Sequence, residues 1–183
     1  MTEAEFRSAI LDNSFNGELL RRLPDLGLGQ CHLTAGCLYQ TVWNQLSGHA
    51  PDWGIKDYDV FYFDEDLSWE AEDRVIRRVA EATADFPITV EVRNQARVHL
   101  WYPERFGGDY PQLTSAREGI DLYLISCTRV GIEVETGALH APDGFDDLVA
   151  GKLRMNPRYA KPAKYRDKAE SYRQRWPWLE IMD

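Results

Sequence analysis

The hydrophobic and polar positions of the chain follow two periods, one typical of helices and one typical of strands. Apolar residues that recur every three or four positions predict helices over residues 3–12, 17–23, 37–46, 69–84 and 165–175. Alternating, or continuously β-branched and aromatic, runs predict strands over residues 30–34, 58–63, 88–92, 97–102 and 128–134. A capping box at Ser115–Glu118 opens a further helix, and a short helix is expected near residues 145–150. This order predicts an α+β fold in which a small mixed sheet is flanked by helices.

The length of 183 residues favours one domain with a small appendage. We place the main domain at residues 1–151 and a basic, helical C-terminal extension, packed on the same domain, at residues 152–183. Residues 155–164, rich in Pro, Lys and Arg, are typical of a linker. The extension carries nine basic and four acidic residues, whereas the rest of the chain carries 12 basic and 26 acidic residues. This asymmetry fits a solvated basic tail or a surface for a ligand or partner.

Composition narrows the class of protein. A hydrophobic content of 44% argues against intrinsic disorder, and the net charge of −9 argues against a cationic nucleic-acid binder. No apolar run approaches the roughly 20 residues that span a bilayer, and the acidic start does not have the layout of a signal peptide. Three scattered cysteines and four histidines without ligand spacing indicate neither a disulfide framework nor a zinc site. We therefore expect a soluble, cytoplasmic protein with no membrane partner.

Two aspartates stand two positions apart where the second predicted strand begins. Side chains at i and i+2 share one face of a strand, so Asp57 and Asp59 project together. Because neighbouring ionised carboxylates repel each other, and hard oxygen ligands suit Mg²⁺ or Mn²⁺, a divalent cation between them is expected. Glu91, central in the strand 88–92, completes a three-carboxylate set if the two strands are adjacent. The alternative is that the aspartates form a solvated strand end and that Glu91 lies on an exposed strand face.

A glycine separates the first predicted strand from the helix that follows it. Gly36 lets a phosphate approach the backbone, and the free N–H groups at the start of that helix, at Cys37, can bind it. Arg93 shares the strand face of Glu91, and Lys56 precedes the aspartates. Both are candidates for holding phosphate, and for both the alternative is an ordinary surface charge. The order strand–Gly–helix, strand with Asp-x-Asp, helix, and strand with a single acid is more specific than any of its parts.

These motifs resemble the polymerase-β-like nucleotidyltransferases, and more closely a bacterial family known only as nucleotidyltransferase family proteins. The resembling stretches cover nearly the whole chain: Gly36–Asn44, Gly54–Asp64, Glu91–Trp101, Ala141–Leu148 and Trp176–Pro177. The resemblance implies a fold like the head domain of tRNA CCA-adding enzymes, with Mg²⁺ or Mn²⁺ and a nucleoside triphosphate. Cys37 departs from the pattern, which has Gly or Ser there, and a thiol is a poorer phosphate donor than a hydroxyl.

The first hypothesis is a nucleotidyltransferase that moves a nucleoside monophosphate from a nucleoside triphosphate to an unknown hydroxyl acceptor. Its metal ligands and catalytic residues would be Asp57, Asp59 and Glu91, with Glu91 helping to deprotonate the acceptor. Its nucleotide-binding residues would be Gly36, Cys37, Lys56 and Arg93. The acidic main domain favours a small molecule or a protein over RNA as acceptor.

Two rival hypotheses come from other classes of protein. One is a catalytically inactive NTP-binding or protein-interaction module with the same fold, which Cys37 favours. The other is a metal-dependent glycosyltransferase. It is disfavoured by the short chain and by the strand–Gly–helix unit close before the aspartates.

Overall fold

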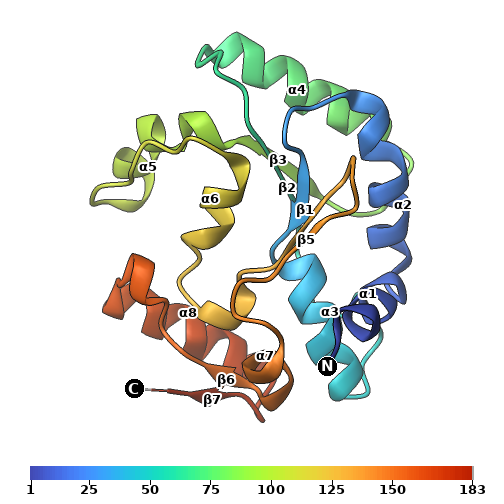
Figure 1. Cartoon of the computed structure of the whole chain (residues 1–183), viewed down its shortest axis with the longest axis vertical. Coiled ribbons are helices and arrows are strands. Elements are labelled where there is room, and N and C mark those ends of the chain that lie inside the picture. The colour runs from blue at the N-terminus through green and yellow to red at the C-terminus, as the bar shows by residue number, and fades with distance from the viewer. Residues whose placement is uncertain (183) are drawn as a thin grey trace.

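In the computed structural model, which describes residues 1–182, a mixed five-stranded sheet lies at the centre of the molecule (Figure 1). Its strands follow the order β3-β2-β1-β4-β5. Their bounds are β1 His32–Thr34, β2 Tyr58–Tyr62, β3 Val90–Asn94, β4 Gly131–Glu133 and β5 Leu139–His140. The main helices are α1 Glu3–Leu11, α2 Ser14–Arg22, α3 Gly36–Leu46, α4 Trp69–Ala82, α5 Val98–Phe106, α6 Ala116–Asp121, α7 Asp146–Ala150 and α8 Pro162–Arg175. The predicted α+β class is confirmed.

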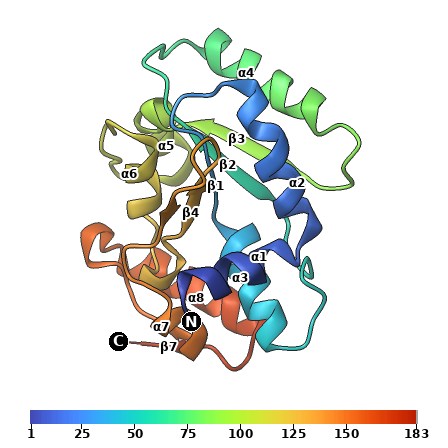
Figure 2. The ribbon, with the colours of Figure 1, turned by 45° about the vertical axis from the view of Figure 1, so that its right-hand side comes forward.

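The sheet separates two groups of helices. Figures 1 and 2 show α1, α2 and α4 on one side and α5 and α6 on the other. Strand β2 alternates accordingly, since Tyr58, Val60 and Tyr62 are buried while Asp59 and Phe61 are only partly covered. The period of two thus turns three apolar side chains toward the core and leaves the aspartate on the face of α5 and α6. Among the described residues of this five-stranded sheet, only β2 and β3 are parallel neighbours, with α4 as their crossover.

The C-terminal segment packs into the same core as the rest of the chain. Trp43 of α3 lies 5.3 Å from the ring of Tyr172 and 5.4 Å from that of Trp176. Trp176 Nε1 also donates a hydrogen bond to Asn44 Oδ1 at 3.0 Å. After α8 the chain returns as β7 (Glu180–Ile181), parallel to β6 (Lys152–Leu153). Trp176 therefore anchors the end of α8 in the core.

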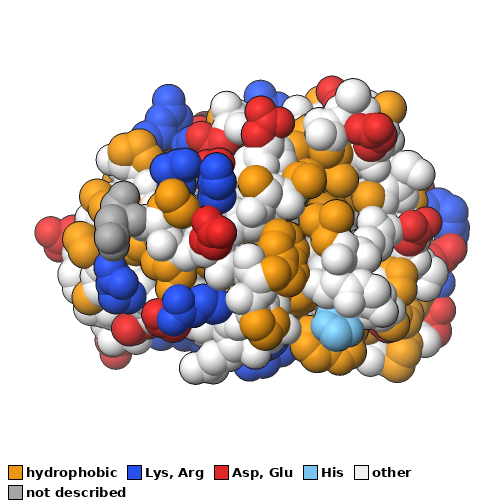
Figure 3. All heavy atoms as spheres, turned by 90° about the horizontal axis from the view of Figure 1, so that it is seen from below, with side chains coloured by type: hydrophobic (Ala, Val, Ile, Leu, Met, Phe, Trp, Pro, Cys, Tyr) orange, Lys and Arg blue, Asp and Glu red, His pale blue; other side chains and the backbone are white. Residues whose placement is uncertain are grey.

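Basic side chains of this segment lie on one end of the molecule. Figure 3 shows them gathered where α8, β6 and β7 reach the surface, interleaved with acidic side chains. Arg173 pairs with Glu170, and Arg154 pairs with Asp147. The positive charge of the tail is therefore partly neutralised at its surface. Within residues 1–182, no helix has the length and apolar character that crossing a membrane requires.

The strand expected at residues 97–102 is wrong, because this stretch is helical. Strand β3 ends at Asn94, whose side chain accepts a hydrogen bond from Ala96 N and begins the short 3₁₀ helix Gln95–Arg97. Helix α5 follows directly. Buried Glu72 of α4 accepts a hydrogen bond from Asn94 N and pairs with Arg97, which fixes this turn. These contacts lie 22 and 25 residues apart in the sequence, so an alternating local pattern does not reveal them.

Candidate active site

The register of β2 and β3 brings two of the predicted carboxylates together. Asp59 is the direct partner of Glu91, and the next pair on the same face is Phe61 with Arg93. Asp57 stands one residue before β2, so it shares the face of Asp59. All five side chains line one cavity of about 410 Å³. The predicted adjacency of the two strands is confirmed.

Asp59 is the most electrostatically perturbed carboxylate of this cavity. Its pKa is raised to about 7, first by burial and then by the nearby charges of Asp57 and Glu91. Lys168 and Arg93 act in the opposite direction. A carboxyl group that shares a cavity with two others and loses solvent favours its protonated form unless a cation joins it. This is the charge pattern of a cation-binding site.

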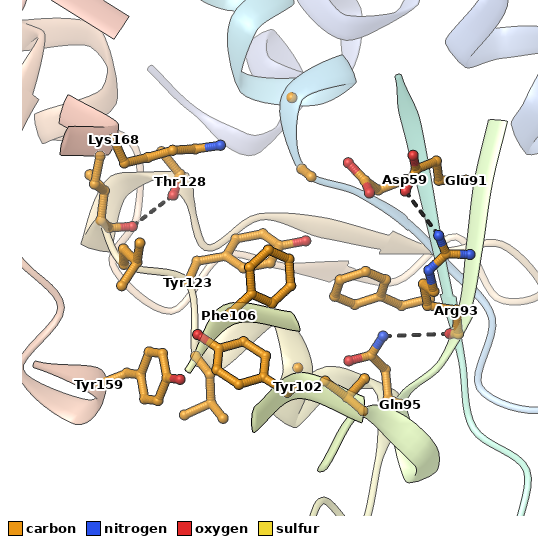
Figure 4. Close-up of a pocket in the computed structure, with 18 of the residues that line it drawn as sticks. Asp59, Glu91, Arg93, Gln95, Tyr102, Phe106, Tyr123, Thr128, Tyr159 and Lys168 are labelled. Carbon is orange, nitrogen blue, oxygen red and sulfur yellow. Dashed lines mark hydrogen bonds and ion pairs between the residues drawn. The ribbon is translucent and has the colours of Figure 1, made fainter. Parts of the chain in front are cut away.

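Arg93 already neutralises one member of the set. Its Nη2 lies 3.3 Å from Glu91 Oε2, and Figure 4 shows this pair beside Asp59. Among residues 1–182, no three His, Cys, Asp or Glu side chains are arranged as they stand to hold a metal ion. The donor chemistry of Asp57 and Asp59 fits a divalent cation, since both are hard oxygen ligands that repel each other. In this arrangement Glu91 Oε2 pairs with Arg93.

The start of α3 lies beside Asp59, because Thr34, which comes just before it, is the strand partner of Asp59. Ala35, at the N-cap of α3, has φ 63° and ψ −143°, a conformation that costs a residue with a Cβ about 1–3 kcal/mol. Gly36 follows and lines the cavity. A Cβ at this position would come within 2.4 Å of Gln40 Nε2, so the glycine makes room for the Gln40 amide. Strain at Ala35 and a missing Cβ at Gly36 together shape this wall.

Gln40 is held in a defined orientation by the last turn of α8. Arg175 Nη1 donates hydrogen bonds to Gln40 Oε1 at 3.1 Å and to Gly54 O at 2.9 Å. Because arginine has only donors, the amide oxygen must face Arg175 and the amide nitrogen must face Gly36. The buried Gln40 therefore presents N–H groups at the edge of the cavity.

The side chains of two predicted nucleotide-binding residues, Cys37 and Lys56, do not line the cavity. Cys37 is fully buried, and its Sγ donates a hydrogen bond to Thr34 O at 3.1 Å. Burial raises the pKa of this thiol well above its usual value. Lys56 is exposed, and its side chain does not line the cavity. Gly36 and Arg93 do line it.

Lys168 of α8 is a cavity residue that sequence reasoning missed. Figure 4 shows its amine extending toward Asp59 and Glu91 from the opposite wall. Desolvation lowers its pKa, while the charges of Asp59 and Asp57 oppose that shift. The available signal was the spacing of Lys164, Lys168 and Tyr172, which places all three on one face of a helix.

The part of the cavity away from the carboxylates is aromatic. Five rings line it together with the amide of Gln95, as Figure 4 shows for four of them: Tyr102, Phe106, Tyr110, Tyr123 and Tyr159. We call these five residues the aromatic chamber. They come from α5, the loop after it, the segment after α6 and the 3₁₀ helix Pro157–Tyr159. None of them was singled out from the sequence.

Comparisons with known proteins agree with this architecture. A family model described as nucleotidyltransferase matches residues 21–181. An NMR structure described as revealing a CCA-adding enzyme head domain is 26% identical, with 90% of this chain and 87% of that chain covered and a TM-score of 0.69. The Thermotoga maritima CCA-adding enzyme complexed with tRNA is 14% identical, with 91% and 38% covered and a TM-score of 0.50, a likeness of fold alone. No curated protein matches the sequence. The expected resemblance to the head domain is confirmed.

Proposed function

The chain belongs to the nucleotidyltransferase family, and on that premise we propose that it transfers a nucleoside monophosphate from a nucleoside triphosphate to a hydroxyl acceptor. The observation that carries the proposal is the convergence of Asp57, Asp59 and Glu91 on one cavity wall, with Gly36 beside them and Lys168 facing them. An acidic wall suits a divalent cation, and the facing donors suit the phosphates of its nucleotide. A cytoplasmic location accords with this choice of substrate.

In the proposed reaction, the acceptor oxygen attacks the α-phosphorus of the nucleotide. The bond from that phosphorus to the bridging oxygen breaks, and pyrophosphate leaves. Asp57 and Asp59 would hold Mg²⁺ or Mn²⁺, which polarises the α-phosphoryl oxygen and supports the leaving charge. Glu91 would accept the proton of the attacking hydroxyl once Arg93 turns from Glu91 to the phosphates. The 3.3 Å pair of Arg93 and Glu91 is then a resting contact that substrate replaces.

The phosphates would be bound mainly from the α3 and α8 side. The backbone N–H groups of Gly36 and Cys37 offer unpaired donors at the helix start, so the thiol of Cys37 has no part in binding. Gln40, oriented by Arg175, supplies a neutral donor, and Lys168 supplies charge. Lys56 would add positive charge at the cavity edge without direct contact.

The proposal is tested by calorimetric titration of ATP, GTP, CTP and UTP in the presence of excess Mg²⁺. Each nucleotide is titrated into the unaltered protein and into the Asp59→Asn variant. Loss of a metal ligand should weaken Mg²⁺-dependent binding on the order of 100-fold or more. Asp64→Asn, in an exposed residue just after the same strand, is the matched control and should bind as the unaltered protein does. Equal nucleotide affinity of Asp59→Asn and the unaltered protein would sink the site assignment.

A second experiment separates an active enzyme from an inactive NTP-binding module. The protein is incubated with α-³²P-labelled nucleotides, Mg²⁺ and fractionated cell extract. Label should appear in a small-molecule or protein fraction rather than in RNA, and Asp59→Asn should transfer none. Nucleotide binding without transfer to any fraction would favour the inactive module.

A further inference from the structure

The aromatic chamber is a preformed, ordered part of the cavity. Its rings contact one another, with centroid separations of 4.6 Å between Tyr102 and Tyr110, 5.1 Å between Tyr102 and Phe106, and 5.9 Å between Tyr110 and Tyr159. Edge-to-face and tilted ring contacts of this kind hold aromatic side chains in place. The chamber therefore offers a fixed shape rather than a loose apolar surface.

Helix α8 fixes the outer wall of the chamber. Lys164 Nζ donates hydrogen bonds to Phe106 O at 2.9 Å, Gly107 O at 3.1 Å and Tyr102 Oη at 3.3 Å. These carbonyls lie at the C-terminal end of α5, where a cation is favoured. The lysine thus ties the wall to α8 one turn before Lys168.

Two polar groups point to a ligand in this chamber. Tyr159 is 9% exposed, and its hydroxyl has no hydrogen-bond partner of good geometry among the described residues. Burial, and then the neighbouring Tyr102 hydroxyl, raise its pKa. A buried hydroxyl without a partner is costly, so a ligand that supplies one is favoured. Gln95 is 2% exposed, and its oxygen lies over Gly119, where a Cβ would come within 2.2 Å of it. Its Nε2 donates a hydrogen bond to Arg93 O at 3.4 Å, so the amide is held with its oxygen toward Gly119.

The charge of the lining excludes some ligands. The acidic residues that line the cavity are Asp57, Asp59 and Glu91, all on the sheet wall. The chamber itself holds neutral tyrosines, since burial raises the pKa of Tyr110 and Tyr123 above the ordinary value. Three cations lie over its rings: Arg105 over Phe106 at 5.3 Å, Lys161 over Tyr159 at 5.3 Å and Lys164 over Tyr102 at 5.0 Å. A polycation is therefore excluded. A flat ring with a polar edge and no positive charge matches the lining best.

The chamber and the carboxylates lie at different places along the cavity. Figure 4 shows Tyr102, Tyr159 and Gln95 on the side of Arg93 that is away from Asp59 and Glu91. Gly36 stands two residues after Thr34, the strand partner of Asp59, so the start of α3 lies at the carboxylate end of the cavity. Resting on the proposed function, we propose that the aromatic chamber binds the acceptor, and that the acceptor is a small molecule with an aromatic ring, a hydroxyl group and no positive charge.

The test uses 2-naphthol, a flat, neutral, hydroxyl-bearing ring, titrated into the full chain by calorimetry. Saturable one-site binding is expected. Tyr159→Phe removes only the unpaired hydroxyl and should weaken binding about fivefold, the size of one hydrogen bond. Its melting temperature should not fall, because no hydrogen bond within the protein is lost. Tyr58→Phe is the matched control, since Tyr58 is buried on the other face of the sheet and bonds to Asn13. It should bind 2-naphthol as the unaltered protein does.

Repeating the titration with Mg²⁺ and the α,β-methylene analogue of ATP identifies the source of the ring. Binding of 2-naphthol unchanged within about twofold supports an acceptor site, because the nucleotide then occupies the other part of the cavity. Competition overturns the acceptor assignment, since the chamber would then hold the nucleoside base. No binding of 2-naphthol, or equal affinity of Tyr159→Phe, overturns the chamber proposal. Nucleotide binding is measured in a separate titration. If the proposed function is wrong, that titration fails, whatever the result with 2-naphthol.

Discussion

The two halves of the cavity are built in different ways. The carboxylate half comes from two neighbouring parallel strands and a nearby helix start, all between residues 35 and 93. The aromatic chamber comes from four separate segments between residues 102 and 159. Strand pairing places side chains at a fixed period of two, so the first half follows from local spacing once the strands are paired. The second half follows from how helices and loops pack, which local spacing does not determine.

Helix α8 is the element that contacts both halves. Lys164, Lys168 and Tyr172 are four residues apart and share one helix face. Lys164 holds the wall of the aromatic chamber, Lys168 faces the carboxylates, and Tyr172 packs on Trp43 in the core. The basic C-terminal segment is therefore part of the site as well as part of the surface.

Lys168→Met should separate the two halves of the cavity most clearly, because it should lower NTP affinity and leave 2-naphthol affinity unchanged. Removing a charged donor that faces the carboxylates should weaken NTP binding in the presence of Mg²⁺ roughly tenfold. Binding of 2-naphthol should stay unchanged, because Lys168 contacts none of the chamber rings. Calorimetry measures both. Lys56→Met, in the exposed lysine that sequence alone favoured, should weaken NTP binding by about twofold or less, as expected of a screened surface charge. A larger effect for Lys56 than for Lys168 would reverse this assignment.

Gly119→Ala should have a smaller effect, and this effect should be on ligand binding in the aromatic chamber. The new Cβ would displace the Gln95 amide, whose flexible end can move at low cost to the fold. We expect 2-naphthol affinity to fall about threefold, the loss of one modest hydrogen bond, with NTP affinity unchanged. Gly17→Ala is the control, because that helical glycine has only an ordinary 3.6 Å contact with Leu11. Loss of nucleotide binding in Gly119→Ala would show that the halves are not separable.

The smallest expected difference is in pH dependence. Asp59 titrates at about 7 in the folded protein and near 3.8 when unfolded, so between these values only the folded form holds the proton. In the absence of metal, the contribution of Asp59 to the free energy of unfolding should be highest below about pH 4. It should decrease as the pH rises to about 7 and should then level off. Urea denaturation across this range measures the slope. Asp59→Asn should flatten it, whereas Tyr159→Phe should leave it unaltered, since tyrosines do not titrate there. An identical slope in Asp59→Asn would contradict the raised pKa.

Several features of the protein are contained in the sequence alone. The order of the periodic segments predicted the α+β class. The spacing of Asp57 and Asp59, with Gly36 before them and Glu91 after them, carried the resemblance that implies the head-domain fold. The reason is that hydrophobic periodicity and strand alternation are local properties, which can be read from a short stretch of sequence without knowledge of distant contacts. Where a local pattern fits two structures, as at residues 97–102, the contacts of Glu72 with Asn94 and Arg97 decide between them.

Only the tertiary structure decided which side chains reach the cavity. Cys37 and Lys56 adjoin the motif in sequence, yet the thiol turns to Thr34 O and the lysine turns to solvent. Lys168 lies more than one hundred positions from the aspartates, and it arrives because Tyr172 and Trp176 bury their rings against Trp43. Burial of apolar area is non-directional, so it brings distant segments together without leaving a local signature. The aromatic chamber has the same origin.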